Sequence, residues 1–195
     1  MYELEDEIVF ISFDNLYIRK GEQLTKIAAP SRFSRSFQSG SLIFLADESE
    51  GLFQFDGVSL TKLFDYPDRQ AWRIMGIDRE GESLFIVTRD RGLFRYRDGS
   101  LTPLRQEVSP YLQRDQVFSF TAIEEDHYAF GTILNGVYIT DHEGRVIQHL
   151  NKQKGILNNT ILSLHYSPQG HLWLGMDFGI AALRLSSEIA YVLDH

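Results

Sequence analysis

Cysteine is absent from this chain of 195 residues. Its absence excludes disulfides, zinc sites with cysteine ligands and catalysis by a thiol. It does not indicate a compartment, because many exported bacterial proteins also lack cysteine.

Basic residues are outnumbered, with 19 Lys and Arg against 27 Asp and Glu and a net charge of −8. A nucleic-acid partner would favour a basic face, and an anionic membrane surface attracts basic segments, so we expect neither partner. The chain has no run of 18 apolar residues, so we expect no direct insertion of this segment into a membrane. Its acidic start, MYELEDE, is the opposite of the basic start of a signal peptide, and any signal would lie upstream in a longer gene product.

The motifs of common enzyme classes are also missing. The sequence has no G-x-S-x-G elbow, no P-loop and no dinucleotide-binding fingerprint. The six histidines are not spaced as metal-ligand pairs, and the acidic turns at 47–51 and 78–82 lack the ligand pattern of a calcium loop. We therefore expect no enzymatic activity, no catalytic residue, no metal and no cofactor.

Four glycines, by contrast, recur at a regular interval. Gly51, Gly92, Gly136 and Gly179 are 41, 44 and 43 residues apart. Each follows a strand-like apolar run and precedes an apolar pair, and a weaker copy of the pattern has Asn15 in the glycine slot. Repeats of about 40 residues built of strands and turns are the signature of propeller blades. Glycine in this slot suits a tight reversal of the chain, and we expect Asn15 to share its left-handed backbone.

Each period divides into four strand-like pieces. In the second period these are 72–78, 83–89, 93–97 and 100–106. The Asp98-Gly99 pair between the last two suits a two-residue hairpin turn. Helical periodicity is absent, and PYLQRDQ (110–116) is better interpreted as a connecting loop than as a short helical turn. The predicted fold class is all-β: about four full four-stranded antiparallel blades plus a partial N-terminal one, as a partial or small β-propeller.

The beginning of the chain is irregular. Segments 8–14, 16–20 and 23–27 match second, third and fourth strands, and the seven residues before Ile8 are too few for a first strand with its turn. The blades could close a tight ring of four or five or form an arc of a larger ring, and we favour the arc. An open blade edge seeks a partner. The segment 188–194 could fold back onto it, or a second copy or the rest of a parent protein could pair with it. We favour the second option, in which the edge forms a homodimer or joins the rest of the parent protein.

The fourth period resembles the two-component regulator propeller repeat over residues 155–187. The residues that occupy the slots of that repeat are Gly155, Asn158, Asn159, Gly170, Leu172, Trp173, Gly175 and Gly179. The sequence departs from the repeat at Leu157, Pro168 and Met176, where the family usually has Pro, Asp and Thr. The third period keeps Gly131, Thr132 and Gly136 of the same pattern.

The resemblance implies a domain of propeller blades over 1–187, with 188–195 as a last strand or the start of a following β-sandwich domain. It also implies the periplasmic sensor region of a bacterial membrane-bound regulator, whose output domain is a histidine kinase or a DNA-binding domain. Many such regulators respond to oligosaccharides. The partners implied are an oligosaccharide ligand and the remainder of the parent sensor protein.

Loops at the entrances of first strands ring one face of a propeller and carry the candidate ligand-binding residues. These are Tyr66, Arg69, Trp72, Tyr111, Arg114, Asn158 and Asn159. Aromatic rings, guanidinium groups and amides suit polyols or carboxylated sugars, through stacking and multiple hydrogen bonds. The alternative is ordinary loop chemistry, with the asparagines forming turns and Trp72 capping the core.

Trp173 lies elsewhere, in an interior slot of a second strand. We expect it to pack between blades, where its replacement by alanine would cost about 3–5 kcal/mol. Three functions stay open at this point. The main one is a non-enzymatic sensor module, the second is a protein-interaction scaffold without a small ligand, and the most distant is a carbohydrate-active propeller enzyme.

Overall fold

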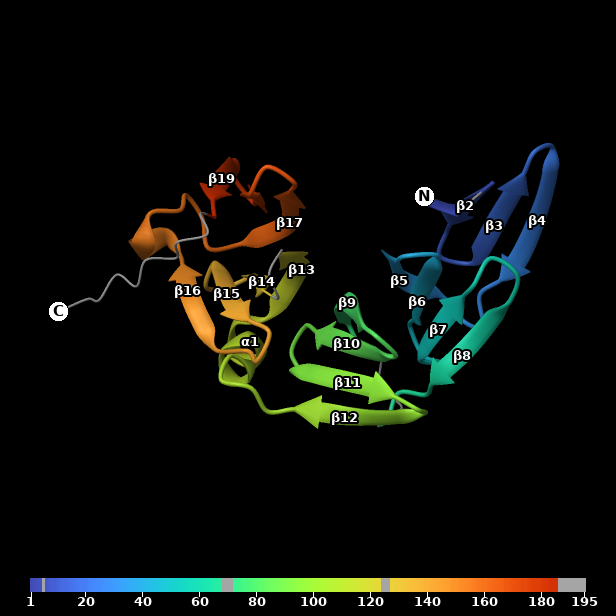
Figure 1. Cartoon of the computed structure of the whole chain (residues 1–195), viewed down its shortest axis with the longest axis horizontal. Helices are drawn as coiled ribbons and strands as arrows, with labels where there is room; N and C mark the ends of the chain where they lie inside the picture. Colours follow the sequence, from blue (N-terminus) through green and yellow to red (C-terminus); the bar gives the residue numbers. More distant parts are fainter. Residues whose placement is uncertain (5, 68–71, 124–126, 186–195) are drawn as a thin grey trace. The chain divides into compact units, whose positions relative to one another are not determined.

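The computed structural model describes residues 1–4, 6–67, 72–123 and 127–185. Across these residues the chain forms five antiparallel sheets in chain order, and each strand pairs with its neighbours in sequence (Figure 1). This is the predicted all-β architecture of propeller blades. The segments 188–194 and 188–195, for which the sequence predicted a last strand, the start of a following domain or a contact with the first blade, lie outside the described residues.

We number the five sheets as blades one to five. Blade one contains β1 (Tyr2–Leu4), β2 (Glu7–Ile11), β3 (Asn15–Lys20) and β4 (Gln23–Ala28). Blade two contains β5 (Phe33–Ser39), β6 (Leu42–Asp47), β7 (Leu52–Phe55) and β8 (Leu60–Phe64). Blade three contains β9 (Ile74–Glu80), β10 (Ser83–Thr88), β11 (Leu93–Arg97) and β12 (Ser100–Leu104).

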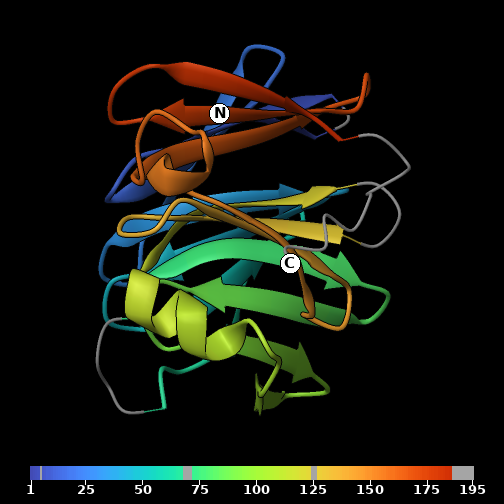
Figure 2. The ribbon, with the colours of Figure 1, turned by 90° about the vertical axis from the view of Figure 1, so that its left-hand side faces the viewer.

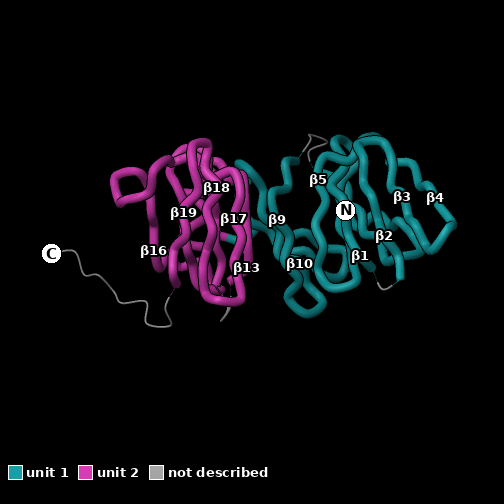
Figure 3. The backbone as a smooth tube through the Cα atoms, turned by 90° about the horizontal axis from the view of Figure 1, so that it is seen from above, with its two compact units in different colours: residues 1–104 teal, residues 105–195 magenta. Residues whose placement is uncertain are grey.

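Blades four and five follow a short helix, α1 (Ser109–Asp115). Blade four contains β13 (Val117–Ile123), β14 (His127–Thr132), β15 (Val137–Asp141) and β16 (Val146–Leu150). A 3₁₀ turn, η1 (Lys152–Lys154), leads to blade five, in which the described residues form β17 (Ile161–Ser167), β18 (His171–Met176) and β19 (Ile180–Arg184). The chain divides into two compact units, residues 1–104 and residues 105–195, which Figure 3 shows in teal and magenta.

The same hydrogen bond closes the reversal from the second to the third strand of every blade. A residue at the end of the second strand donates its backbone N–H to the carbonyl of the turn residue that precedes or begins the third strand. The donor and acceptor pairs are Ser12–Asn15, Asp47–Gly51, Thr88–Gly92, Thr132–Gly136 and Met176–Gly179, with N···O distances of 2.8, 2.9, 3.1, 2.8 and 3.0 Å. The glycine slots are therefore structurally equivalent, as the repeat predicts.

The four glycines of these turns all have a positive φ, between 78° and 123°. Asn15 does not, because among the described residues other than glycine only Asp98 and Gln116 have a positive φ. The expectation that Asn15 shares the left-handed backbone is wrong. In this turn the Ser12 hydroxyl also accepts a hydrogen bond from the Asn15 N–H. The hydroxyl of Thr88 holds its turn in a related way, because it donates to the Gly92 carbonyl and accepts from the Arg91 N–H.

Other local predictions hold at the level of single turns. Asp98 and Gly99 have φ values of 49° and 77°, so both residues of the β11–β12 turn take the left-handed conformation that a two-residue hairpin requires. The third strand of this blade, Leu93–Arg97, has the predicted boundaries.

Two predictions about chain segments are corrected. The N-terminal blade has a first strand, β1, which pairs antiparallel with β2 and places Leu4 opposite Glu7. Leu4 is buried in the core of the first two blades, and this contact fixes β1 despite its length of three residues. The segment 110–116 is not a loop, because most of it forms α1, with Pro in its first turn and the buried Leu112 on its inner face.

Apolar cores join consecutive blades inside each unit. In residues 1–104, one core combines β1–β3 with blade two, and a second combines blade two with blade three. In residues 105–185, a third core joins blades four and five. Figure 2 shows the red strands of blade five as a layer beside the yellow and orange strands of blade four.

Trp173 does not belong to these cores. Leu172 and Leu174 of β18 are fully buried, whereas Trp173 between them is 45% exposed. Successive residues of a strand point to opposite faces, and blade five turns the Leu172 and Leu174 face toward blade four. The expected burial of Trp173 is therefore wrong, because its side chain lies on the opposite face of the sheet from Leu172 and Leu174 and is 45% exposed.

Candidate functional site

The predicted ligand-binding residues fall into three groups, and the first of them is buried. The Tyr66 hydroxyl donates to the carbonyl of Asp47 at 2.8 Å, and the Tyr66 ring stacks on Trp72 with centroids 6.0 Å apart and planes at 14°. Trp72 also contacts Phe94, at 4.6 Å between centroids, and the Arg91 guanidinium lies 5.4 Å from the centroid of its ring. Both rings belong to the core between blades two and three. Their faces are occupied by protein, so they cap this core.

The asparagines of the second group shape a loop. The Asn158 Oδ1 accepts the Thr160 N–H at 3.1 Å, and the Asn159 Oδ1 accepts the Lys152 N–H at 2.7 Å. Such side-chain to backbone bonds define local turns. Both asparagines are half-buried. Arg69 lies outside the described residues.

The third group, Tyr111 and Arg114, lies on one face of α1, since residues three apart are neighbours on a helix. The Arg114 guanidinium lies 5.6 Å from the centroid of the Tyr111 ring. Tyr111 is 39% exposed, and most of the Arg114 side chain is exposed as well. The helix faces the viewer in Figure 2. The structure thus brings together two residues that the sequence placed in one loop.

A buried carboxylate holds Arg114 in place. The Arg114 Nε and Nη2 donate to the two carboxylate oxygens of Asp115 at 2.7 and 2.8 Å. The same carboxylate accepts the Tyr138 hydroxyl at 2.6 Å and the Asn135 Nδ2 at 3.0 Å. Burial raises the pKa of Asp115, but the hydrogen bonds from Arg114, Tyr138 and Asn135 outweigh burial and hold this pKa below its usual value.

Tyr138 lies at the centre of a stack of rings. Its ring is parallel to that of Tyr111, at 5.9 Å and 10°, and to that of His149, at 4.1 Å and 1°. Burial, followed by the hydrogen bond to Asp115, raises the pKa of the Tyr138 hydroxyl. The hydroxyl therefore stays protonated and donates to Asp115 across the physiological pH range.

Polar contacts fix the far end of the stack. The His149 Nε2 lies 2.8 Å from the carbonyl oxygen of Asn135, and the Asn151 Nδ2 donates to the Asn135 Oδ1 at 3.0 Å. We call the whole set the Asp115 cluster: Tyr111, Arg114, Asp115, Asn135, Tyr138, His149 and Asn151. It joins α1 to β15, β16 and the turn before β15, all in residues 105–185.

The Asp115 cluster has an exposed aromatic ring beside a guanidinium group that the buried Asp115 carboxylate holds in position. This combination suits stacking on an apolar ring face together with hydrogen bonds to hydroxyl or carboxylate oxygens. Across the described residues, no three His, Asp or Glu side chains are grouped as a metal site requires.

Sequence reasoning missed five members of the cluster: Asp115, Asn135, Tyr138, His149 and Asn151. Asp115 stood inside a segment that was interpreted as a loop, so nothing marked it as buried. The other four lie in or beside blade four, about 20 to 35 positions further along the chain, and no spacing rule connects them to α1. A helix interpretation of 110–116 would have put Tyr111, Arg114 and Asp115 together, but not their partners.

Known proteins share the fold of this chain, but their sequence identity to it is low. No protein-family model matches the sequence, and no curated protein matches it. Solved structures do match. The extracellular domain of BT4673 from B. thetaiotaomicron, a protein attributed to the one component or hybrid two component systems, matches with a TM-score of 0.72 and 16% identity over 95% of this chain.

Two further structures show the range of the likeness. The extracellular domain of BT3049 from B. thetaiotaomicron, attributed to the hybrid two component systems, matches with a TM-score of 0.62 and 14% identity over 94% of this chain. The WD40 β-propeller domain of Doa1 matches with a TM-score of 0.64 and 12% identity over 93% of this chain and 62% of its own. The likeness confirms the propeller fold, and the resemblance predicted from the sequence is borne out at this level.

The chain spans 27% of the length of each of the two B. thetaiotaomicron domains. In the part of the chain that the structure describes, no helix has the length and apolar character needed to cross a membrane.

Proposed function

We propose that this chain is a non-enzymatic, ligand-binding sensor module from the extracytoplasmic, periplasmic region of a bacterial two-component-type regulator. The observation that carries the proposal is the likeness, over 95% of the chain, to an extracellular domain attributed to such a system. The resemblance of residues 155–187 to the two-component regulator propeller repeat supports the same proposal. The rest of the parent regulator is then the chain's partner in signalling.

The Asp115 cluster is the ligand site that we propose for this module, and oligosaccharides are the ligand class. Tyr111 supplies a flat apolar ring that can stack on a pyranose, and Arg114 supplies donors for hydroxyl or carboxylate groups. Because Asp115, Tyr138 and Asn135 already hold Arg114, binding would cost little side-chain entropy. Asn158 and Asn159 contribute to the loop before β17 and are secondary candidates.

A thermal-shift scan against plant and host oligosaccharides tests the proposal. A ligand that binds only the folded state at about 100 times its Kd adds about 2.7 kcal/mol to the free energy of unfolding, so a clear rise in Tm is expected. Tyr111→Ala should abolish this rise. Phe178→Ala removes another exposed ring of the same unit and is the matched control, which should keep the rise.

The alternative function is a protein-interaction scaffold without a small ligand. It is favoured by the exposed Trp173, which lies on the face of blade five opposite to the one that packs on blade four. A scan in which no oligosaccharide shifts the Tm, while a protein partner does, would replace the sensor proposal with the scaffold. Release of sugar products from the same oligosaccharides would contradict the non-enzymatic assignment.

A further inference from the structure

The Arg114 guanidinium group has two edges that can each hold a carboxylate, and Asp115 occupies one of them. A guanidinium carries five N–H donors in a planar fork. The Nε and one N–H of Nη2 donate to the two Asp115 oxygens at 2.7 and 2.8 Å. The Nη1 and the second N–H of Nη2 form the other edge, which points away from Asp115. The Arg114 side chain is 61% exposed, so a ligand can reach this outer edge.

The outer edge of Arg114 suits a carboxylate better than a hydroxyl group. Two parallel N–H groups match the two oxygens of a carboxylate, and hydrogen bonds between charged partners are about twice as strong as those between neutral ones. Asp115 is only 3% exposed and keeps the guanidinium in place before any ligand arrives. The Asp115 charge also offsets the charge of Arg114, so a preference for anions needs further positive charge nearby.

The loops around the Asp115 cluster carry this positive charge. The loops 105–116, 133–136 and 151–160 adjoin one another, since the Ile133 N–H donates to the Gln116 carbonyl at 2.9 Å and the Gly136 N–H to the Asn159 carbonyl at 2.8 Å. Their basic residues are Arg105, Arg114, Lys152 and Lys154, and their acidic residues are Glu107 and Asp115. Both lysines are exposed. The whole chain has a net charge of −8, so the basic excess is a local property of these loops.

Tyr111 adds an apolar surface next to the outer edge of Arg114. Its ring stacks on Tyr138 at 5.9 Å, is still 39% exposed, and has the Arg114 guanidinium 5.6 Å from its centroid. A pyranose that carries a carboxylate on its ring presents an apolar face and an anion within one small unit. A neutral hexose presents the apolar face and hydroxyl groups only.

We propose that the Asp115 cluster selects acidic oligosaccharides and binds a uronic acid residue, with the sugar carboxylate on the outer edge of Arg114 and the sugar ring on Tyr111. This inference rests on the ligand site proposed above and adds the class of sugar. Lys152 and Lys154 attract the anion toward the site without contacting the sugar ring. Asp115 is a positioning residue, because it orients Arg114 and does not touch the ligand.

Isothermal titration calorimetry with matched pairs of sugars tests the proposal. The acidic probes are oligogalacturonate, oligomannuronate and hyaluronan oligosaccharides, and each is compared with its own carboxyl-reduced, neutral form. At least one acidic probe should bind about tenfold or more tightly than its reduced form, because only the carboxylate makes two charge-assisted hydrogen bonds. Its Kd should rise with salt concentration, since salt screens the attraction, and the Kd of the reduced form should not.

Substitutions at the site separate charge from geometry. Arg114→Gln should bring the ratio of the two Kd values close to one. Arg114→Lys keeps the charge but lacks the planar fork, so it should restore only part of the ratio, and it decides the question where Arg114→Gln does not fold. Tyr111→Ala should weaken the acidic and the reduced form alike, because both stack on the ring. Circular dichroism melts check the fold of every variant.

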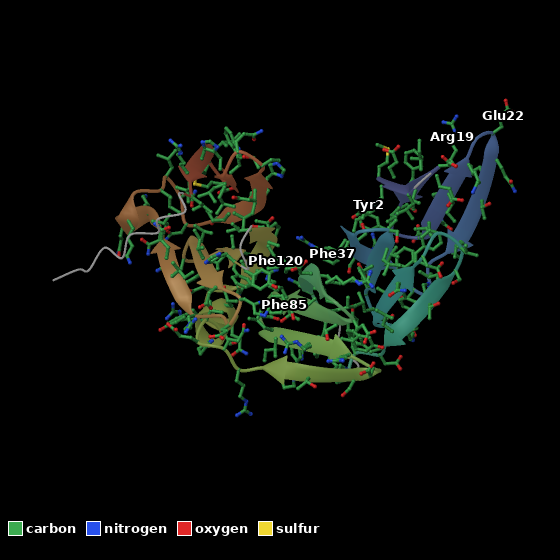
Figure 4. The ribbon with its side chains drawn as sticks, viewed as in Figure 1. Tyr2, Arg19, Glu22, Phe37, Phe85 and Phe120 are labelled. Carbon is green, nitrogen blue, oxygen red and sulfur yellow. The ribbon has the colours of Figure 1, made fainter. Side chains whose placement is uncertain are left out.

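Two arginines outside the cluster provide matched controls. Arg145 belongs to the same unit and is also paired with an aspartate, since its Nε donates to Asp141 at 2.6 Å. Arg19 lies near the tip of the β3–β4 hairpin, as Figure 4 shows. Arg145→Gln and Arg19→Gln change the net charge as Arg114→Gln does, and both should keep the wild-type ratio.

Three results would overturn the proposal. Reduced forms that bind as tightly as the acidic forms, or more tightly, would contradict the selection of acidic sugars and leave the proposed sensor function intact. A ratio that Arg114→Gln and Arg114→Lys leave unchanged would place the carboxylate elsewhere on the protein. Absence of binding by every acidic and every neutral oligosaccharide would overturn the proposed oligosaccharide site together with this inference.

Discussion

Gly136 shows at the residue scale why the repeat needs glycine before the third strand. Its φ is 78°, and an added Cβ would collide with the carbonyl oxygen of Leu150. Gly51 is in the same position relative to the carbonyl oxygen of Phe64. The backbone conformation and the approach of the fourth strand both exclude a side chain, so two independent constraints select one residue type.

We predict that Gly136→Ala destabilises the protein more than Gly21→Ala. Gly21 also has a positive φ, of 58°, but an added Cβ there meets nothing within 4 Å. Gly21→Ala should therefore cost only the left-handed strain of about 1–2 kcal/mol, and Gly136→Ala should cost this strain plus the collision. Urea denaturation of both variants measures the difference. Equal costs would show that the Leu150 carbonyl moves aside freely.

The two tryptophans make a second comparison between single residues. We predict that Trp173→Ala changes the free energy of unfolding of the monomer by less than about 1 kcal/mol, as exposed substitutions do. Trp72→Ala should cost about 3–5 kcal/mol, because Trp72 packs against Tyr66 and Phe94 in the core. Denaturant titrations at low protein concentration check both values. A large cost at Trp173 would mean that its face is covered within one chain.

At the scale of single elements, α1 depends on a buried charge. It is seven residues long, and helices of this length are marginal by themselves. Its position follows from Leu112 in the interior and from Asp115, which accepts hydrogen bonds from blade four. The element is thus held by its contacts and not by its helix propensity, which explains why the sequence pattern did not reveal it.

We predict a pH dependence of stability from Asp115. Its pKa in the folded protein is below the usual value of 3.8, so its contribution is fully present above the unfolded pKa and is lost as pH falls through the folded pKa. The stability difference between wild type and Asp115→Asn should be largest above about pH 5 and should shrink toward about pH 2.

The measurement is a series of urea titrations between these pH values. Asp98→Asn removes an exposed carboxylate from the β11–β12 turn and is the matched control, which should not show the same pH-dependent difference. A difference for Asp115→Asn that stays constant across the range would show that the hydrogen bonds of Asp115 do not depend on its charge.

The whole molecule consists of two compact units, and each contains its own apolar cores. In repeat proteins, stability is close to a sum of repeat terms and nearest-neighbour interfaces. We therefore expect damage in one unit to remain local. Leu174→Ala removes a fully buried side chain between blades four and five, and Leu45→Ala removes one between blades one and two.

We predict that Leu174→Ala accelerates amide hydrogen exchange in blades four and five, while residues 1–104 keep their wild-type protection. Leu45→Ala should do the reverse. Each substitution should cost about 2–5 kcal/mol of local stability. Exchange monitored by mass spectrometry resolves the two units. Uniform acceleration along the chain for either variant would indicate a single cooperative unit.

The sequence by itself determined the repeat, and through it the all-β fold and the turn slots, because strand alternation, glycine backbone freedom and hairpin turns are local properties. The Asp98-Gly99 turn and the strand Leu93–Arg97 followed from neighbours in the chain. Tyr111 and Arg114 could be marked as candidates for the same reason, since they stand in one short polar segment.

Only the tertiary structure decided which side chains of the strands are buried and which side chains from distant parts of the sequence meet. Trp173 lies in the second strand of blade five as Phe44 lies in the second strand of blade two, yet Phe44 is buried against blade three and Trp173 is 45% exposed. The Asp115 carboxylate meets Tyr138 from 23 positions further along the chain. Burial and long-range hydrogen bonds depend on what packs against a residue, and a residue's own sequence neighbours do not contain that information.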